Sequence, residues 1–308
     1  MSNLKETYKR VKIEGILAEN NIDYITYTNR NGESVRAIGG DFQVLVRTSV
    51  DGIPKDLMIP VHVFSNELTK SGEKNKSFLS IEKVKNEFIS IAAAGGEEKA
   101  TKIRLTTDKI GMNEYYDGTG RLVSYPRISA SFVSVATGNF NPEASFEIVM
   151  AVDGIREVLD NEGVPVEPQK LAITGSIVQY NGDVDCIELV TSSPSAITGI
   201  RDYWNIGDTV KAIGILNFSY SVVEVKNNDS SIAFGAPAAT KKQTRRISEL
   251  MITSGTSPFE GDLAIDKAEL TKGKAERLVR LEELKAKGNK PKATPAPSAS
   301  INTDDLGF

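Results

Sequence analysis

The chain has 308 residues, 40% of them hydrophobic, and a formal net charge of −4. A chain of this length leads us to expect two domains and a tail. Its only cysteine, Cys186, excludes an intramolecular disulfide framework, and with His62 as the only histidine the usual zinc site is excluded too.

Neither a membrane span nor a secretory signal is predicted. No run reaches 18 apolar residues, and residues 2–10 are polar, without the apolar segment that a signal peptide needs. Together with the single cysteine, these features lead us to expect a cytoplasmic protein.

Residues 10–64 alternate apolar and polar positions in short runs, which is typical of strands. We expect strands at residues 10–17, 23–28, 34–38, 42–48 and 57–64, separated by glycine-containing turns. Pro60 places the last strand at a sheet edge or a bulge. Apolar side chains then recur at helical spacing and predict a short amphipathic helix: Phe78, Ile81, Val84 and Phe88.

Residues 99–136 contain two long β-prone runs on either side of a turn-rich tetrapeptide, residues 117–120. This arrangement predicts a hairpin, because glycine adopts the positive φ of a tight turn and Asp117 can bond its own backbone. Side chains of a strand point alternately to opposite faces. One face is apolar and contains Phe132 as a core residue, whereas the other carries Lys102, Arg104, Tyr125 and Arg127. Cations beside an aromatic ring on a curved sheet suit a single nucleic-acid strand.

The second half predicts strands at residues 146–152 and 155–159, then a hairpin of residues 171–180 and 183–191 around Asn181-Gly182, the preferred type I′ pair. A further strand at 207–218 is opened by Gly-Asp. The β pattern is expected to stop at residues 241–246, and residues 264–288 predict a helix interrupted near Gly273. Residues 289–308 are rich in Pro, Ala and Ser, and we expect disorder there.

Two features resemble known proteins. Residues 207–216 (GDTVKAIGIL) resemble the fourth strand of an oligonucleotide-binding (OB) fold, and they follow a hairpin and a short helix, as in that five-stranded barrel. Residues 11–17 and 171–177 share an alternation that ends in glycine, and both look like first strands. The chain ends in Asp304-Asp305-Leu306-Gly307-Phe308 behind its Pro/Ala/Ser linker. That ending resembles the tip of bacterial and bacteriophage single-stranded DNA-binding proteins.

The resemblance implies a mainly β chain of two OB-like five-stranded barrels, a C-terminal helix and a disordered acidic-tipped tail. In that family the barrel binds single-stranded DNA (ssDNA) without sequence preference, and the tip recruits replication, recombination and repair proteins. We expect an ssDNA-binding domain at 1–139, a second OB-like domain at 140–240, a basic linker and helix at 241–288, and the tail at 289–308. Two barrels and a long helix look more like a bacteriophage version, in which the second domain could mediate self-association.

The candidate ssDNA contacts are cations and tyrosines of the first domain: Arg10, Lys12, Arg36, Arg47, Lys102, Arg104, Tyr115, Tyr116, Tyr125 and Arg127. The candidate partner contacts are Asp304, Asp305, Leu306 and Phe308. Each has an ordinary alternative, because charged strand faces are common and tyrosines near a hairpin tip also pack beneath loops. We interpret Trp204 as a core residue, because a single tryptophan just before a strand is more often buried in the core than exposed for stacking on bases.

Two other functions stay open. A β-rich structural protein of a virion would explain the acidic charge, although it gives no reason for the tip. A hydrolase or nuclease would have to use Asp183, Asp185 and Glu188, which lie near one turn and make a poor metal site by themselves. The sequence has no phosphate-binding loop of the Walker type and no nucleophile elbow. We therefore expect a binding protein without cofactor or metal, and not an enzyme.

Overall fold

The computed structural model describes residues 4–29, 31–50, 52–160, 162–226 and 240–288. The first part of the chain forms strands β1 (Lys9–Thr28), β2 (Ser34–Val50), β3 (Ile53–Asn66), β4 (Lys102–Thr107), β5 (Ile110–Tyr116), β6 (Leu122–Ser129) and β7 (Ser134–Val135). Helices α1 (Lys76–Glu87) and α2 (Ile91–Ala94) and a 3₁₀ turn (Glu97–Lys99) connect β3 to β4.

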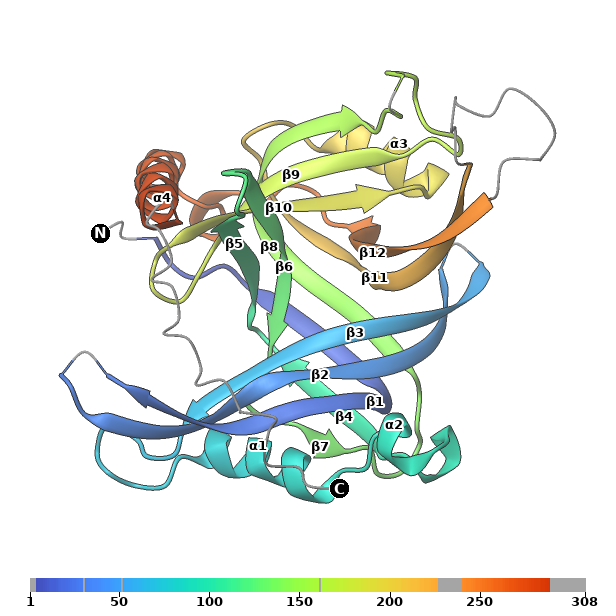
Figure 1. Ribbon diagram of the computed structural model, residues 1–308. Helices are drawn as coiled ribbons and strands as arrows, with labels where there is room; N and C mark the ends of the chain where they lie inside the picture. Colours follow the sequence, from blue (N-terminus) through green and yellow to red (C-terminus); the bar gives the residue numbers. More distant parts are fainter. Residues whose placement is uncertain (1–3, 30, 51, 161, 227–239, 289–308) are drawn as a thin grey trace, which may run out of the picture.

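These strands close into a five-stranded barrel (Figure 1). β1, β2 and β3 form an antiparallel meander, and β4 returns to pair with β1. β4 and β5 follow one another as the two halves of a fourth strand, and β6 and β7 are the two halves of a fifth. The barrel closes where β3 runs parallel to β6, at Val61 opposite Ile128. A three-stranded meander, a helix and two further strands that close in this way are the connectivity of an OB barrel.

A second barrel repeats this plan. Its elements are β8 (Glu143–Glu157), β9 (Leu171–Val178), β10 (Val184–Thr191), α3 (Pro194–Tyr203), β11 (Thr209–Lys226) and β12 (Thr240–Gly255). β8, β9 and β10 form the meander, β11 pairs with β8, and β12 runs parallel to β10 at Val190 opposite Met251. The chain is therefore mainly β, with two OB-like five-stranded barrels. A 3₁₀ turn (Gly261–Leu263) then leads to the C-terminal helix α4 (Lys267–Gly288).

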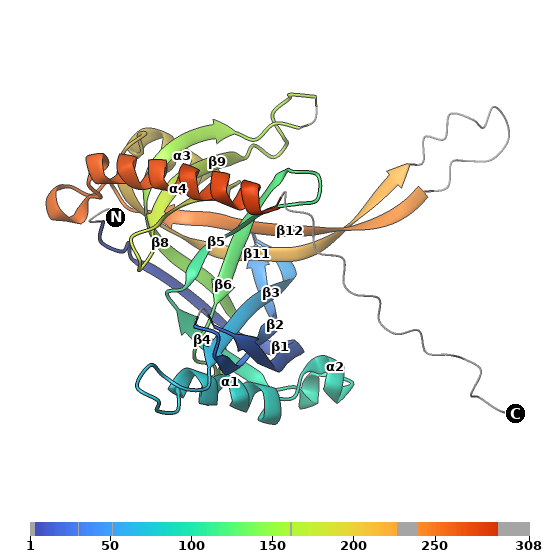
Figure 2. The ribbon, with the colours of Figure 1, turned by 60° about the vertical axis from the view of Figure 1, so that its left-hand side comes forward.

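The two barrels share one continuous sheet, because β8 pairs with β1 from Lys9 opposite Ile148 to Glu14 opposite Glu143. Figure 2 shows α4 lying across the second barrel, and the long β11–β12 ribbon extending away from the body. The expected disordered tail at 289–308 lies outside the described residues.

Alternate side chains of the strands fill the barrels. In β2 the side chains of Phe42, Val44 and Val46 are fully buried, and in β3 those of Ile59 and Val61 face the same interior. Burying each such side chain contributes about 1.5–3 kcal/mol. The amphipathic helix is confirmed as α1, which begins after Asn75 and buries its apolar stripe against the meander, namely Phe78, Ile81 and Val84.

Several expected strands are parts of longer ones. The strands expected at 10–17 and 23–28 are one strand, β1, with a bulge between Leu17 and Glu19. Those at 34–38 and 42–48 are likewise one strand, β2, which passes through Gly39-Gly40. A Cβ on Gly40 would lie 2.2 Å from the carbonyl oxygen of Asn21, so this glycine lets two backbones approach closely and does not end the strand.

The start of the second barrel was placed wrongly from the sequence. Residues 171–177 belong to β9, the second strand of that barrel, and the first strand is β8. The Asp153-Gly154 pair, which separates the two strands expected at 146–152 and 155–159, instead forms a bulge within one strand, β8. The strand predicted at residues 207–218 is confirmed as the fourth strand of this barrel, β11, which continues to Lys226.

The β pattern does not stop at residues 241–246. Those residues lie in β12, the fifth strand, which pairs with β11 along the ribbon. Backbone pairing needs no apolar side chains, so this strand has no apolar signal in its first half. No described helix is long and apolar enough to cross a membrane.

Candidate nucleic-acid interface

The predicted turn at residues 117–120 is confirmed as the tip of the β5–β6 hairpin. The carboxylate of Asp117 accepts hydrogen bonds from the backbone N–H groups of Thr119 (2.9 Å) and Arg121 (3.0 Å) and from the Thr119 hydroxyl. These bonds, that of the hydroxyl above all, lower the pKa of Asp117. Gly120 has φ of 79°, the left-handed conformation that favours glycine. The tip is therefore held by its own residues.

The two strands of the predicted hairpin do not pair along their whole length. β4, which carries Lys102 and Arg104, pairs with β1 and β7, whereas β6, which carries Tyr125 and Arg127, pairs with β5. The chain bends at Asp108-Lys109, between β4 and β5. The single basic face predicted for this stretch is therefore wrong, because its four residues lie on two different parts of the barrel wall.

The outer wall of β1 and β4 carries four of the candidate cations, Arg10, Lys12, Lys102 and Arg104. Within the described residues no ion pair involves Arg10 or Lys12. Lys102 lies over the ring of Phe140, with 4.8 Å from its nitrogen to the ring centroid. Two of these cations are thus unpaired, and Lys102 is held by a ring.

Arg104 is engaged by a buried carboxylate. Its Nε and Nη2 donate to Glu14 at 2.7 and 2.9 Å, and the backbone N–H of Asn141 donates to the same carboxylate at 3.0 Å. The bond from Arg104 lowers the pKa of Glu14 and raises the pKa of Arg104 in turn. Arg104 therefore compensates a buried charge within the barrel wall.

Arg36 and Arg47 are also paired within the protein. Arg47 donates two bonds to Glu97, at 2.7 and 2.6 Å, and lies 3.4 Å from Asp56. Arg36 lies 3.3 Å from Glu67 and 5.1 Å above the ring of Tyr24. Each would have to leave or share these partners to bind a phosphate.

Four aromatic rings lie on the outer wall formed by the β1–β2–β3 meander and the β5–β6 hairpin. We call this surface the aromatic face, defined by Tyr27, Phe64, Tyr115 and Tyr125. Tyr115 and Tyr125 meet edge to face with centroids 6.4 Å apart, and the Tyr125 hydroxyl accepts a bond from Asn113 at 2.7 Å. Tyr27 and Phe64 lie 6.2 Å apart. Phe64 is 48% exposed, Tyr115 45% and Tyr125 41%, and exposed apolar groups that lie together mark an interaction surface.

The register of β3 and β6 shows that these rings share one surface. His62 lies opposite Ser129, so Phe64, two residues beyond His62, points to the same side as Tyr125, four residues before Ser129. Because the two strands are parallel, Phe64 and Tyr125 lie on opposite sides of the His62–Ser129 pair, about 20 Å apart along the strand direction. Arg127, for which the described residues show no ion pair, and His62, 3.0 Å from Asp41, lie between them. A ligand that contacts both ring pairs must be an extended polymer.

The sequence reasoning missed Phe64 and Tyr27. A signal was present for Phe64, because Leu57, Ile59 and Val61 occupy alternate positions of its strand and are buried, which leaves Phe64 on the outer side. Tyr116, one of the predicted contacts, is half-buried on the other side of the hairpin, with Lys285 of α4 at 6.0 Å from its ring. Phe132 was predicted to be core, but it follows the end of β6 and is 58% exposed.

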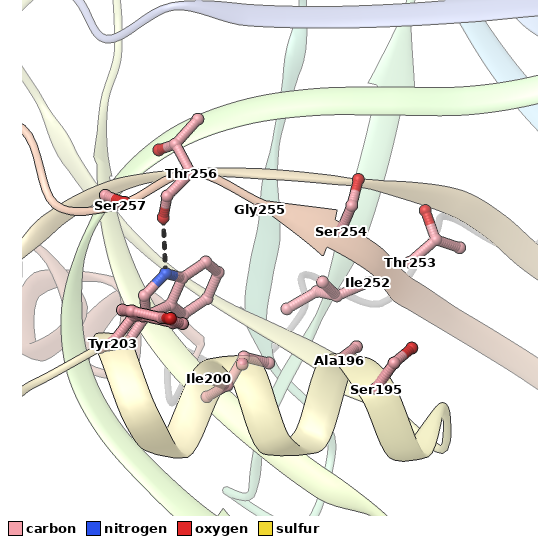
Figure 3. A pocket seen from close by; sticks show the side chains of 12 residues that line it. Ser195, Ala196, Ile200, Tyr203, Ile252, Thr253, Ser254, Gly255, Thr256 and Ser257 are labelled. Carbon is pink, nitrogen blue, oxygen red and sulfur yellow. Dashed lines mark hydrogen bonds between the residues drawn. The ribbon is translucent and has the colours of Figure 1, made fainter.

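Trp204 is confirmed as a core residue. Its indole N–H donates to the carbonyl oxygen of Thr256 at 2.8 Å, and its ring is 5% exposed. Trp204 also lines a hollow of about 360 Å³. Figure 3 shows this hollow between α3, which carries Ile200 and Tyr203, and the segment that carries Ile252 and Thr256. The walls carry hydroxyl, aliphatic and aromatic side chains but no charged group that could bind a phosphate.

The second barrel presents acidic groups that are already engaged. Arg280 of α4 binds Asp183 at 2.7 Å and Asp185 at 3.4 Å, and Arg156 binds Glu188 at 2.7 Å. Burial raises the pKa of Asp185 and of the half-buried Cys186 thiol. No cluster of three metal-binding side chains occurs among the residues that the structure describes.

Comparison with known proteins identifies a family for the chain. No curated protein matches the chain. A deletion mutant of the single-stranded DNA binding protein from Thermus aquaticus is similar at 11% sequence identity and a TM-score of 0.46, over 83% of this chain and 97% of that one. That likeness is too distant to carry an argument. Residues 8–287, which include all the barrel strands and all of α4 except Gly288, match the model of the YorF family. The chain therefore belongs to the YorF family.

Proposed function

We propose that this protein binds single-stranded DNA without sequence preference, and that the aromatic face of the first barrel is its principal contact. The observation that carries the proposal is the set of rings on the aromatic face, of which Phe64, Tyr115 and Tyr125 are exposed and Tyr27 is half-buried, with the unpaired Arg127 among them. Every base has a π-face, so stacking on such rings is tolerant of sequence and contributes about 1–3 kcal/mol per base.

The charges support the same ligand. Arg127 on the aromatic face, and Arg10 and Lys12 on the wall of β1, are available to phosphates without breaking an internal ion pair. A net charge of −4 on the whole chain does not prevent this, because a local basic surface determines binding at close range. Release of counterions from the phosphates makes such binding weaken steeply as salt is added.

The proposal is for a binding protein and not an enzyme. Asp183, Asp185 and Glu188, on which a nuclease would depend, are all held by arginines. These pairs compensate the carboxylates and leave them poorly placed to bind a metal ion. A protein that coats single strands needs none of them.

We propose that the C-terminal tail recruits partner proteins. Asp304, Asp305, Leu306 and Phe308, which lie outside the described residues, would recruit replication and recombination proteins of a bacteriophage or its host in the cytoplasm. A phenyl ring beside carboxylates can dock into an apolar pocket with a basic rim. Loss of residues 304–308 should then abolish partner capture and leave the barrels folded.

Alanine substitution of Phe64 tests the aromatic face. We expect Phe64→Ala to weaken binding of oligo-dT about 5- to 150-fold in a fluorescence titration, the equivalent of one lost stack. Tyr203→Ala is the matched control, because Tyr203 is 62% exposed on α3 of the other barrel. Equal affinities for Phe64→Ala and the unaltered chain would refute the assignment of this face.

A further inference from the structure

We propose that a groove at the junction of the two barrels binds a second stretch of the same DNA strand, so that the strand continues from the aromatic face onto the second barrel. This inference rests on the proposed function and adds a site to it. The junction groove is defined by Tyr8, Arg10, Lys109, Arg127, Phe132 and Tyr180. It consists of two adjoining hollows of about 520 and 420 Å³, which share Asp108 and Lys109 in their walls.

Three distant segments are hydrogen-bonded together to build the groove. The backbone N–H of Thr7 donates to the carbonyl oxygen of Val178 at 3.1 Å, and the buried ammonium of Lys9 donates to the same oxygen at 2.9 Å. Gln179 of the second barrel donates from its side chain to the carbonyl oxygen of Ile110 in β5 at 3.2 Å. The N-terminal segment, the β9–β10 turn and the start of β5 therefore hold one another in place.

Three aromatic rings of the groove are left in solvent. Tyr180 is 91% exposed, Phe132 58% and Tyr8 48%. They come from three separate segments, each of which lies outside the strands. Exposed rings that gather along one groove indicate a binding surface, and bases are the ligands that stack on such rings without regard to sequence.

The charges of the groove favour an anionic ligand. Arg10 and Arg127 have no ion pair within the described part of the chain, and the ammonium of Lys109 donates only to the Ser131 hydroxyl, at 2.6 Å. Among the acidic wall residues, Glu6 is bound by Lys9 at 3.0 Å. Asp108 is exposed and forms no ion pair within the described residues, so it opposes an anion and weakens the site.

Asp185 also faces the groove, but it is buried and its charge is compensated. It accepts bonds from Gln179 at 2.8 Å and from the backbone N–H of Met112 at 3.3 Å, and Arg280 lies 3.4 Å away. Three cations therefore oppose one uncompensated carboxylate, that of Asp108.

The groove continues the aromatic face and is not separate from it. Arg127 lines one hollow and lies two residues from Tyr125 on the same side of β6. Arg127 belongs to both surfaces, and the groove leads from it past Lys109 to the rings of Tyr180 in one hollow and Phe132 in the other. This path takes the ligand from the first barrel to a turn of the second.

The dependence of affinity on oligonucleotide length tests the groove. We would titrate the full chain and a Phe132→Ala/Tyr180→Ala variant with oligo-dT of about 6 and about 30 nucleotides, since one OB barrel covers about 4–16. Both side chains are exposed, so the variant should fold. We expect unchanged affinity for the short oligonucleotide and a loss of about tenfold or more for the long one, the equivalent of one or two stacks. Asp108→Asn should tighten binding of the long oligonucleotide.

The possible outcomes separate this inference from the function on which it rests. If the unaltered chain binds neither oligonucleotide, the proposed function fails and the groove fails with it. If the chain binds both, and the double variant binds the long one as tightly as the unaltered chain, the groove alone is refuted. A loss for the short oligonucleotide as well would make the groove the primary site and overturn its role as an extension.

Discussion

Gly273 of α4 marks the closest approach of the C-terminal helix to the second barrel. A Cβ at this position would lie 2.5 Å from Cγ2 of Val184 in β10 and 3.2 Å from Cδ1 of Leu4. Val184 is 1% exposed and β-branched, so it has little freedom to move aside. In Gly273→Ala, overpacking should lower the free energy of unfolding by about 1–3 kcal/mol. The better helix propensity of alanine should raise it by about 1 kcal/mol.

Gly199 of α3 is the matched control for this substitution. No atom lies within 4 Å of a Cβ built on Gly199, so Gly199→Ala should be stabilised by the higher helix propensity of alanine without a steric clash. The helix term is common to both variants, and their difference in free energy of unfolding isolates the packing term, about 1–3 kcal/mol. We expect Gly199→Ala to melt above the unaltered chain and Gly273→Ala to melt a few degrees below Gly199→Ala.

Thermal unfolding followed by circular dichroism measures this difference. If Gly273→Ala is as stable as Gly199→Ala, then α4 does not pack on β10 at Val184, and the reasoning is refuted. The interrupted helix that the sequence suggested at Gly273 would then be the better description.

Three further predictions concern charge, a buried donor and the ligand. The pKa of Glu14 is lowered in the folded state, so its ionised form stabilises the fold above about pH 4.5, the ordinary pKa of a glutamate. This contribution is lost as the pH falls below that value. The free energies of unfolding of the unaltered chain and Glu14→Gln, measured in urea, should therefore converge in acid, and a difference that grows as the pH falls would contradict this. Trp204→Phe removes the donor to Thr256 and should cost about 1 kcal/mol in urea unfolding, whereas unchanged stability would mean that water replaces the bond. Tyr125→Ala should weaken oligo-dT binding without changing its salt slope, whereas Arg127→Ala should lower that slope by about one phosphate contact; equal slopes for the two variants would contradict these roles.

The strands and turns were predictable where local chemistry decides them. Asp117 and Gly120 specify a turn by themselves, and Asn181-Gly182 does the same for the β9–β10 hairpin. The fold class followed because alternation and turn spacing are local properties of the sequence. Strand length did not follow, since Gly40 and Gly154 lie inside strands, where neighbouring backbones approach closely or a bulge forms.

The candidate site was only partly predictable, because pairing between distant segments decides it. Arg104 alternates with apolar residues as a solvated cation would, but Glu14, 90 positions earlier in the chain, faces it across the β1–β4 pair. Tyr180 and Phe132 gave no signal, since they belong to different barrels, and contacts such as the hydrogen bond from Gln179 to Ile110 hold the two barrels together. Alternation shows which side of a strand a residue faces, but not what lies on that side.

Binding of single-stranded DNA is the central claim, and one titration tests it most directly. The full chain would be titrated with oligo-dT of about 30 nucleotides, long enough for both barrels, over a series of salt concentrations. We predict tight binding at low salt and a linear fall of log K with log salt, with a slope that reflects about 0.7 counterions per phosphate contact. Absence of binding at low salt, or an affinity that does not change with salt, would contradict the account.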